Sequence, residues 1–374
     1  MQFAFSEDQH WLKTSARRFC QENAVLNKLE PGEVNEYPEG LWQKIAQELG
    51  WTALIIPEEY GGAGLGFVEL AALMEEIGRS LLPSPFFSTV CLGTNAILRA
   101  GNQEQKQTYL PSIAAGEMTV SLAYIDKDAA QHDSSVVMEA KREGDKYLIS
   151  GEKTFVLDGH IADLILVAAK ASDTKHIELF AIPSDTAGLT AKRRPTMDPT
   201  RCLADISFEK LEVSAAQKLD GASKPSTVFQ DILSSAAVAL AAEQVGGTER
   251  CLDMAVTYAK DRHQFGQPIG SFQAIKHKCA DMLTLLESAR SAAYYAAWAT
   301  SHAPEELSSV ASLAKIYCSE AYFECASENI QIHGGIGFTW EHEAHFFFKR
   351  AQADELFLGT PSSHRETLAE ELGL

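Results

Sequence analysis

One stretch of the sequence combines a cation, a turn and a glutamine in a way that suits phosphate binding. This stretch, RHQFGQPIGSFQ, runs from Arg262 to Gln273 between two long apolar-periodic segments. Arg262 supplies a positive charge and backbone N–H groups at helix ends supply donors, so the stretch could hold a pyrophosphate. The alternative is a plain connection between two helices, in which Gly266 and Pro268 only turn the chain. The residue types alone leave both interpretations open.

A second stretch pairs glycines with histidines and aromatic residues. It reads ENIQIHGGIGFTWEHEAHFFFKRA and spans residues 328–351. Paired glycines end a helix and let the backbone come close to a ligand. No matching set of cysteines or carboxylates accompanies His333, His342 and His345 at a metal-binding spacing. We therefore interpret these histidines as hydrogen-bonded or solvated side chains and the aromatic residues as packing groups, and we predict no metal site.

The hydrophobic period along the chain indicates which elements position these stretches. Residues 6–116 follow a helical period, and Ser6 with Gln9 forms a capping-box pattern. Residues 118–213 change to short strands separated by turn residues, which predicts an antiparallel barrel or sandwich. From Ser226 onward, long alanine-rich helical runs predict an antiparallel bundle. The expected domains are therefore 1–116, 117–215 and 225–374, with a linker near 216–225.

Composition and charge exclude several classes of protein. The chain has 374 residues, 45% of them hydrophobic, and a net charge of −19. Nucleic acids and anionic membranes reward clustered positive charge, so neither is an expected partner. No apolar run approaches the ~20 residues that cross a bilayer, and the first residues lack the basic-then-apolar order of a signal peptide. Seven scattered cysteines without a C-x-x-C pair indicate reduced thiols in a cytoplasmic protein.

Three motifs occur together in the order and spacing of a known family. They are PEEYGGAG at residues 57–64, RHQFGQPIGSFQ at 262–273 and QIHGGIGF at 331–338. Together with the helix–β–helix layout, they make the whole chain resemble an acyl-CoA dehydrogenase. The resemblance implies an N-terminal all-α domain, a middle β-barrel domain and a C-terminal four-helix bundle, assembled as a dimer of dimers.

The resemblance also implies a reaction and a cofactor. In the family, a carboxylate removes the α-proton of an acyl-CoA, the β-hydrogen passes as hydride to FAD, and a 2,3-enoyl-CoA forms. The electrons then leave to an electron-transferring flavoprotein, and FAD lies at a subunit interface. Motif matching implies that the cofactor contacts of this chain are Arg262, Gln264, Phe265, Gln273, Gln331, Gly334 and Gly335 for pyrophosphate and adenosine, and Thr360 for the flavin region.

The sequence departs from the family where the catalytic groups belong. Leu358 replaces the usual glutamate near the C-terminus, and the alternative position on the long helix falls on Ala236. Neither side chain accepts a proton. In the middle domain, GEKTFVLDG places Phe155 and Leu157 where the family has Trp and Thr beside the flavin. Phe155 can still stack on the flavin ring, but Leu157 cannot hydrogen-bond it.

These departures lead to three hypotheses. The leading one is the flavin-supporting subunit of a heteromeric acyl-CoA dehydrogenase that acts on a bulky acyl-CoA, such as a steroid side chain, with a glutamate-bearing paralogue as partner. The second is a self-sufficient homotetramer whose base has moved to Glu243, about 10 Å along the helix from Ala236, or to Glu355. The third is a non-catalytic member used for binding or regulation. For both glutamates, a solvated helix residue is the simpler interpretation.

Overall fold

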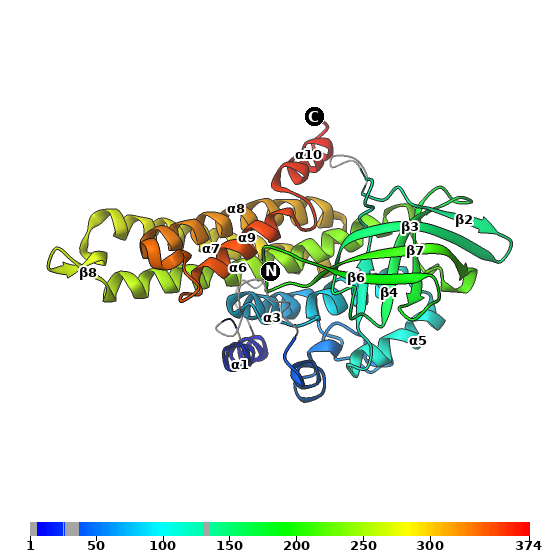
Figure 1. The fold of residues 1–374 in the computed structure, drawn as a ribbon, viewed down its shortest axis with the longest axis horizontal. Coiled ribbons are helices and arrows are strands. Elements are labelled where there is room, and N and C mark those ends of the chain that lie inside the picture. The colour runs from blue at the N-terminus through cyan, green and yellow to red at the C-terminus, as the bar shows by residue number, and fades with distance from the viewer. Residues whose placement is uncertain (1–5, 25, 27–36, 130–134) are drawn as a thin grey trace.

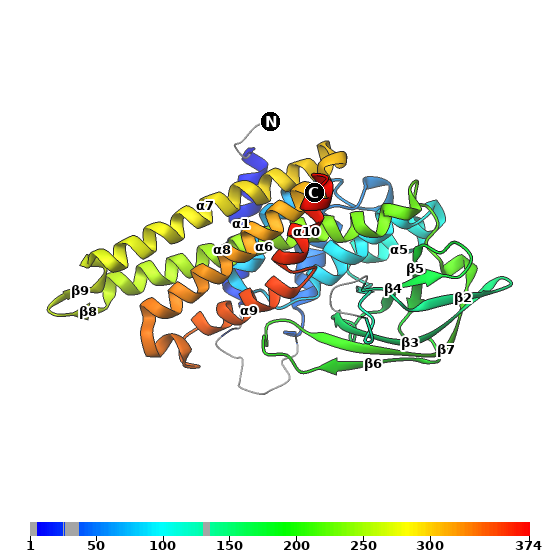
Figure 2. The ribbon, with the colours of Figure 1, turned by 90° about the horizontal axis from the view of Figure 1, so that it is seen from above.

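The computed structural model describes residues 6–24, 26, 37–129 and 135–374. A helical part, a β-sheet and a second helical part follow one another along the chain (Figure 1). The long helices of the last part lie side by side, and the sheet lies near one end of them (Figures 1 and 2). This is the helix–β–helix order that the hydrophobic periods predict. Residues 1–5, which enter the argument against a signal peptide, lie outside the described part of the chain.

The N-terminal part consists of α-helices joined by shorter helical segments. The predicted capping box starts the first helix: Gln9 N donates to Ser6 Oγ at 3.2 Å, and Ser6 N donates to Gln9 Oε1 at 2.9 Å. Satisfying these end groups fixes where the helix begins. The main elements are α1 (Glu7–Asn23), α2 (Leu41–Gln43), α3 (Phe67–Ser80), the segment η5 (Phe87–Thr94), α4 (Asn95–Ala100) and α5 (Gln103–Ala114).

The middle part is a curled sheet. Its strand order is β1-β4-β2-β3-β7-β6, and β5 pairs with β4. The strands are β1 (Val120–Ala123), β2 (Glu139–Glu143), β3 (Lys146–Leu157), β4 (Leu164–Ala171), β5 (Ile177–Pro183), β6 (Leu189–Arg194) and β7 (Leu203–Ser214). The expected antiparallel pairing holds for β2–β3, β3–β7, β4–β5 and β6–β7. It is wrong for β1 and β2 against β4, which pair in parallel. β2 and β4 run in the same direction because the antiparallel strand β3 lies between them in the sequence.

Strand β4 explains why the sheet joins the helices so closely. Its alternate residues Leu164 and Leu166 face a core shared with both helical parts. The residues between them, Ile165 and Val167, face a separate core inside the sheet. Because successive side chains of a strand point to opposite faces, a strand buried on both faces must be apolar throughout. The continuous apolar run in β4 follows from this double burial.

The C-terminal part is the predicted helix bundle. Its helices are α6 (Pro225–Asp261), α7 (Gln273–His302), α8 (Leu307–His333), α9 (Ala344–Leu356) and α10 (Pro361–Glu371). Between α6 and α7 the chain forms a small hairpin, β8 (His263–Gln264) and β9 (Gln267–Pro268). The two turn residues, Phe265 and Gly266, have φ of 54° and 80°. Positive φ at both central positions is typical of a tight two-residue hairpin turn.

Buried carboxylates tie the N-terminal helices to the bundle. Glu75 of α3 is fully buried and accepts hydrogen bonds from Lys13 of α1, Arg290 of α7 and Tyr294 of α7. Glu76 is also fully buried and pairs with Arg17 of α1. Buried charges are tolerated when they are paired in this way. These contacts fix α3 against the bundle and therefore fix one wall of the cavity described below.

All seven cysteines are free, and six of them are buried, as expected for reduced core thiols. Among the described helices, none combines the length and the apolarity that a membrane span requires.

Candidate functional site

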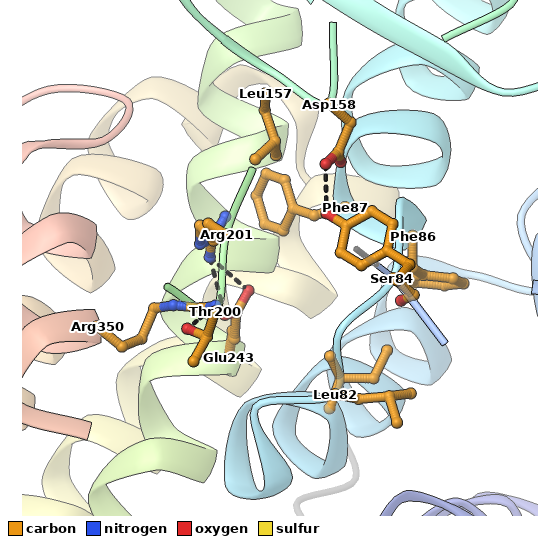
Figure 3. Close-up of a pocket in the computed structure, with 12 residues that line it drawn as sticks. Leu82, Ser84, Phe86, Phe87, Leu157, Asp158, Thr200, Arg201, Glu243 and Arg350 are labelled. Atoms are coloured by element: carbon orange, nitrogen blue, oxygen red, sulfur yellow. Dashed lines mark hydrogen bonds and ion pairs between the residues drawn. The ribbon is translucent and has the colours of Figure 1, made fainter. Parts of the chain in front are cut away.

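A small cavity lined by both charged and apolar side chains lies where the sheet meets the helical parts (Figure 3). Its volume is about 20 Å³, which is room for about one water molecule. Leu157 and Asp158 reach it from the end of β3, Phe87 from η5, and Glu243 from the middle of α6. The full set of lining residues is Tyr37, Ile77, Leu82, Ser84, Phe86, Phe87, Leu157, Asp158, Thr200, Arg201, Glu243 and Arg350.

Close packing of α3 on α6 presents Glu243 to this cavity. Gly78 of α3 touches the backbone of α6, because a Cβ there would lie 2.0 Å from the Glu243 carbonyl oxygen. Any side chain at this position would push the two helices apart. Glu243 itself is 3% exposed. The carboxylate therefore needs partners within the protein.

Two arginines supply those partners. Arg201 Nη2 donates to both carboxylate oxygens of Glu243 at 2.8 and 2.9 Å, and Arg350 Nη1 donates to Oε1 at 2.5 Å. Arg350 also donates from Nε to Asp198 Oδ2 at 2.7 Å and from Nη2 to Thr200 Oγ1 at 2.5 Å. Figure 3 shows Arg201 and Arg350 converging on Glu243. We call Asp198, Arg201, Glu243, Arg350 and Asp354 the buried ion cluster.

Asp354 is the least satisfied member of the buried ion cluster. It is fully buried, and its Oδ1 lies 3.1 Å from Arg201 Nη2, yet neither carboxylate oxygen has a partner in hydrogen-bond geometry. Burial raises the pKa of Asp354 to about 7. Arg350 keeps its charge, because its neighbouring carboxylates raise its pKa against the effect of burial. The cluster therefore holds two permanent cations, with Asp354 as the group that titrates near neutral pH.

Arg201 forms ion pairs within the buried ion cluster, and its side chain also fills the space beside the cavity. Its guanidinium lies 5.1 Å from the ring centre of Phe87 and 5.2 Å from that of Phe357. The two rings are 5.5 Å apart, so the cation sits against both of them. A guanidinium held by two carboxylates and two rings is firmly placed.

The floor of the cavity carries a second titratable carboxylate. Asp158 is buried, accepts hydrogen bonds from Tyr37 and from Ser88 Oγ, the latter at 2.6 Å, and has a φ of 56°. Burial raises the pKa of Asp158 to about 6. Asp158 thus links the sheet to η5 and to the N-terminal segment. Neither Asp158 nor Tyr37 is singled out by the sequence motifs.

The two family base positions lie in the interior. Ala236 of α6 is fully buried, and Leu358 is 8% exposed in the turn between α9 and α10. Of the two candidate replacements, Glu243 belongs to the buried ion cluster. Glu355 is half-buried, and its Oε2 lies 3.5 Å from Gln352 Nε2. Within the described residues, Glu243 is thus the candidate base that lines the cavity.

Phe155 projects from the sheet at an irregularity in β3. The β3–β7 register shifts between Lys153 and Val156, and Phe155 has a φ of 54°. Such left-handed backbone is costly for an aromatic residue and is typical of functional surfaces. The ring is 46% exposed, and the Arg194 guanidinium lies 4.4 Å from its centre. Leu157, two residues later, is buried and lines the cavity.

The predicted phosphate and adenosine contacts gather at the far end of the bundle. Gln264 and Phe265 belong to the β8–β9 hairpin, Arg262 caps the end of α6 directly before it, and all three are exposed. Gln273 begins α7, and a 2.5 Å ion pair between Lys278 and Glu328 joins this end of α7 to the end of α8. The remaining predicted contacts, Gln331, Gly334 and Gly335, are exposed at the end of α8.

One chain does not bring all the predicted flavin contacts together. Glu243, beside the cavity, and Arg262, at the hairpin, are 19 residues apart on one continuous helix, which corresponds to about 28 Å. Figures 1 and 2 show the hairpin at one end of the bundle and the sheet at the other. Phe155 and Thr360 lie away from the hairpin, on the sheet and at the start of α10. The structure therefore places the predicted flavin contacts in two separate groups, one at the hairpin end of the bundle and one near the sheet and α10.

The histidines singled out in the sequence form a stacked group. His333 stacks on Tyr258 with ring centres 4.3 Å apart, and His342 lies 4.3 Å from His333. His345 is buried among aromatic rings, and burial lowers its pKa to about 4. Across the described residues, no group of three or more metal-ligating side chains occurs.

Sequence reasoning missed most of the buried ion cluster. Asp198 and Arg201 are in a loop, and Arg350 and Asp354 are in α9, about 150 residues away. A weak signal was present in α9, where Phe346, Arg350 and Asp354 repeat every four residues. An arginine and an aspartate that share a helix face with a core phenylalanine need buried partners.

Comparison with known proteins identifies the class of protein that this fold and site define. The models for the N-terminal, middle and C-terminal domains of acyl-CoA dehydrogenase match residues 6–117, 122–211 and 226–373. The chain therefore belongs to the acyl-CoA dehydrogenase family, whose members are FAD-dependent oxidoreductases that act on the CH–CH bond of acyl-CoA.

Individual relatives extend along the whole chain. Acyl-CoA dehydrogenase IpdE2 of Mycolicibacterium smegmatis is 32% identical, over 98% of this chain and 99% of that protein. The structure of butyryl-CoA dehydrogenase from Megasphaera elsdenii matches with a TM-score of 0.92 and 26% identity, covering 100% of both chains. The ChsE4–ChsE5 complex from Mycobacterium tuberculosis matches with a TM-score of 0.89 and 25% identity, covering 100% of this chain and 99% of that one.

The residues present fit one half of an FAD better than the other. At the hairpin, the Arg262 side chain has no ion-pair partner among the described residues, and a Cβ on Gly334 or Gly335 would meet nothing within 4 Å. An open cation beside bare backbone suits a pyrophosphate and its nucleoside. At the sheet, the Leu157 side chain has no group that can hydrogen-bond the flavin, and Arg194 already lies over Phe155. When bound, FAD supplies the hydride acceptor of the desaturation.

Proposed function

We propose that this chain is the flavin-supporting subunit of a heteromeric, FAD-dependent acyl-CoA dehydrogenase that desaturates a bulky acyl-CoA. In this proposal its hairpin end binds the pyrophosphate and adenosine of an FAD whose flavin ring lies on a partner subunit. The partner carries the glutamate base and the acyl site. The proposed contacts to FAD are Arg262, Gln264, Phe265, Gln273, Gln331, Gly334 and Gly335, with Phe155 and Thr360 as the remaining contacts on the ring side.

The observation that carries this proposal is the small size of the cavity beside Leu157. A volume of about 20 Å³ accommodates a water molecule but no acyl chain. Arg201, packed against Phe87 and Phe357, fills the neighbouring space, and the buried ion cluster holds it there. Opening the cavity would leave buried charges unpaired, which is costly. A chain of this kind can support a flavin site at its other end without binding an acyl group itself.

The position of Glu243 favours a second candidate, the self-sufficient enzyme with a relocated base. Glu243 lines the cavity together with Leu157, the position that the family places beside the flavin. Against this role stand the three hydrogen bonds that its carboxylate accepts from Arg201 and Arg350. If Glu243 took a proton from a substrate, its carboxylate would become a neutral carboxyl group, and these charge-assisted hydrogen bonds to the arginines would be weakened or lost. We therefore assign Glu243 a structural role.

The assembly is part of the proposal. The two half-sites at opposite ends of the bundle support a tetramer in which each FAD lies between two chains. The ChsE4–ChsE5 relative is a complex of two differently named chains, which supports a heteromer with a glutamate-bearing paralogue. Another relative, CarC, is a subunit of a caffeyl-CoA reductase–Etf complex, and this supports an electron-transferring flavoprotein as the electron acceptor.

Three measurements separate the candidate functions. The chain is purified alone and together with a glutamate-bearing acyl-CoA dehydrogenase paralogue from the same organism. The supporting-subunit proposal expects little bound FAD and little acyl-CoA oxidation from the lone chain, with both restored in the mixture. Full activity of the lone chain that is lost in Glu243→Gln would establish the relocated base. Absence of flavin from both preparations would leave only a non-catalytic role.

A further inference from the structure

The turn between α9 and α10 is held in an unusual shape. Leu358 and Gly359 have φ of 61° and 100°, both in the left-handed region. Leucine is rarely found there, because its Cβ crowds the following carbonyl group. Gly359 is required, since a Cβ at this position would lie 2.9 Å from His364 Nε2 and 3.1 Å from Ser363 Oγ. Surrounding contacts must therefore fix the turn from outside.

His364 of α10 provides one of these contacts. Its Nε2 lies 3.0 Å from the Leu358 carbonyl oxygen, and its Nδ1 lies 3.1 Å from Ser312 Oγ on α8. A carbonyl oxygen only accepts hydrogen bonds, so Nε2 carries the proton and Ser312 donates to Nδ1. Burial lowers the pKa of His364, which favours this neutral form. The imidazole thus connects α8 to the strained residue of the turn.

Lys315, one helical turn further along α8, contacts the end of α9, where the turn begins. It is fully buried, and its ammonium group donates to the Asp354 and Glu355 carbonyl oxygens at 2.9 and 3.2 Å and to Ser319 Oγ at 2.9 Å. Three donors therefore meet three acceptors. Two of these acceptors are terminal carbonyl groups of α9, where a cation is favoured by the helix dipole. Lys315 therefore fixes the point at which α9 ends and the turn begins.

We propose that His364 and Lys315 are positioning residues that hold the turn 357–360 in its left-handed shape from the side of α8. The turn carries Leu358, at the family base position, and Thr360, at the flavin-side position. The turn that these two residues hold carries no carboxylate at residue 358 in this chain. The inference concerns the same site as the proposed function and rests on it only for the flavin contact of Thr360.

The decisive experiment measures amide hydrogen exchange in the full-length chain, in the peptide that covers residues 357–364. His364→Ala removes both contacts, whereas His364→Gln keeps a donor able to reach the Leu358 carbonyl. His302→Ala is the matched control, because His302 also bonds a backbone carbonyl, that of Trp298, but on an exposed part of α7. Lys315→Met tests the second positioning residue with a side chain of similar length and no charge.

We expect faster amide exchange in this peptide alone in His364→Ala, and a normal exchange rate in His364→Gln. His364→Ala should speed exchange of this peptide roughly threefold to tenfold, the effect of one net hydrogen bond, while other peptides keep their rates. His364→Gln and His302→Ala should stay within twofold of the unmodified chain. In the assembled enzyme, His364→Ala should also shift the visible circular dichroism of the bound flavin, and His364→Gln should restore it.

Several results would overturn the inference. One is unchanged exchange in both His364→Ala and Lys315→Met. Another is equally faster amide exchange in all peptides of the chain, which would show general destabilisation rather than positioning. If His364→Ala does not fold, the same comparison is made with Ser312→Ala, which removes only the contact between Ser312 Oγ and His364 Nδ1. If the variants exchange as expected but the assembled protein contains no flavin, the proposed function is refuted and the positioning role of His364 and Lys315 stands.

Discussion

Replacing Arg201 by methionine tests the buried ion cluster directly. Methionine keeps an unbranched apolar stem between the rings of Phe87 and Phe357 but removes the charge and all donors. Glu243 then loses two hydrogen bonds of 2.8 and 2.9 Å and keeps only Arg350 as a cationic partner. Asp354 loses the cation 3.1 Å from its carboxylate. The substitution therefore leaves buried negative charge without compensation.

The cost of this change follows from the burial of the groups. Removing one partner of a buried ion pair typically destabilises by about 3–5 kcal/mol. An unfolding entropy near 2.1 cal/mol/K per residue gives about 0.8 kcal/mol/K for a chain of this length, so the melting midpoint should fall by roughly 4–6 °C. The fall should be larger at pH 8 than at pH 5, since Asp354, whose pKa is about 7, is protonated and needs no cation at the lower pH.

The assay is thermal unfolding followed by circular dichroism, from pH 5 to pH 8. Arg142→Met is the control: Arg142 pairs with Asp173 at 2.8 Å, but its side chain is 49% exposed. A surface pair contributes at most about 1 kcal/mol, so its midpoint should move by about 1 °C or less. The reasoning is wrong if the melting midpoint of Arg201→Met equals that of the unmodified chain at every pH, or if the midpoint of Arg142→Met falls by as much as that of Arg201→Met.

Three further outcomes are expected. Arg262→Ala should weaken FAD binding by the assembled enzyme about 10- to 100-fold in a fluorescence titration, through loss of a charge-assisted contact, whereas Lys260→Ala should not. Glu243→Gln should lower the melting midpoint yet leave turnover by the assembled enzyme within about twofold; a loss of ~10²-fold or more would make it the base. Raising the pH from 5 to 8 should remove the stability that Asp354 and Asp158 contribute, because their raised pKa values mean that folding retains protons which the unfolded chain releases. Buried histidines such as His345, whose pKa is lowered to about 4, act in the opposite sense over the lower part of this range. The test is therefore the difference between variants: Asp354→Asn should lose less stability, or gain more, between pH 5 and 8 than the unmodified chain, and an identical slope would contradict the assignment.

The fold could be predicted because its signals are local. A capping box at Ser6, the change of period near residue 118 and the long alanine-rich runs each reflect contacts within a few residues. The strand order could not be predicted, since the parallel pairing of β1 with β4 depends on which apolar run has both faces buried. That information lies in the packing of the sheet against the helices.

The candidate site was only partly accessible to the same reasoning. Arg262 and Gly334 stand in motifs that fix local backbone shape, and the structure places both at the exposed end of the bundle. By contrast, Arg201 and Arg350 meet across about 150 residues, and neither has a recognisable motif. Glu243 therefore looked like a solvated helix residue, whereas it is buried and paired. Long-range charge pairing leaves little trace in a single sequence.

The central claim is that this chain supports a flavin site without supplying a base. The most direct measurement is anaerobic flavin reduction by a bulky acyl-CoA, followed by absorbance after rapid mixing. The lone chain, supplied with excess FAD, should show almost no reduction, and addition of the glutamate-bearing partner should restore it by a factor of ~10² or more. Rapid reduction by the lone chain, abolished by Glu243→Gln, would contradict the claim and identify Glu243 as the base.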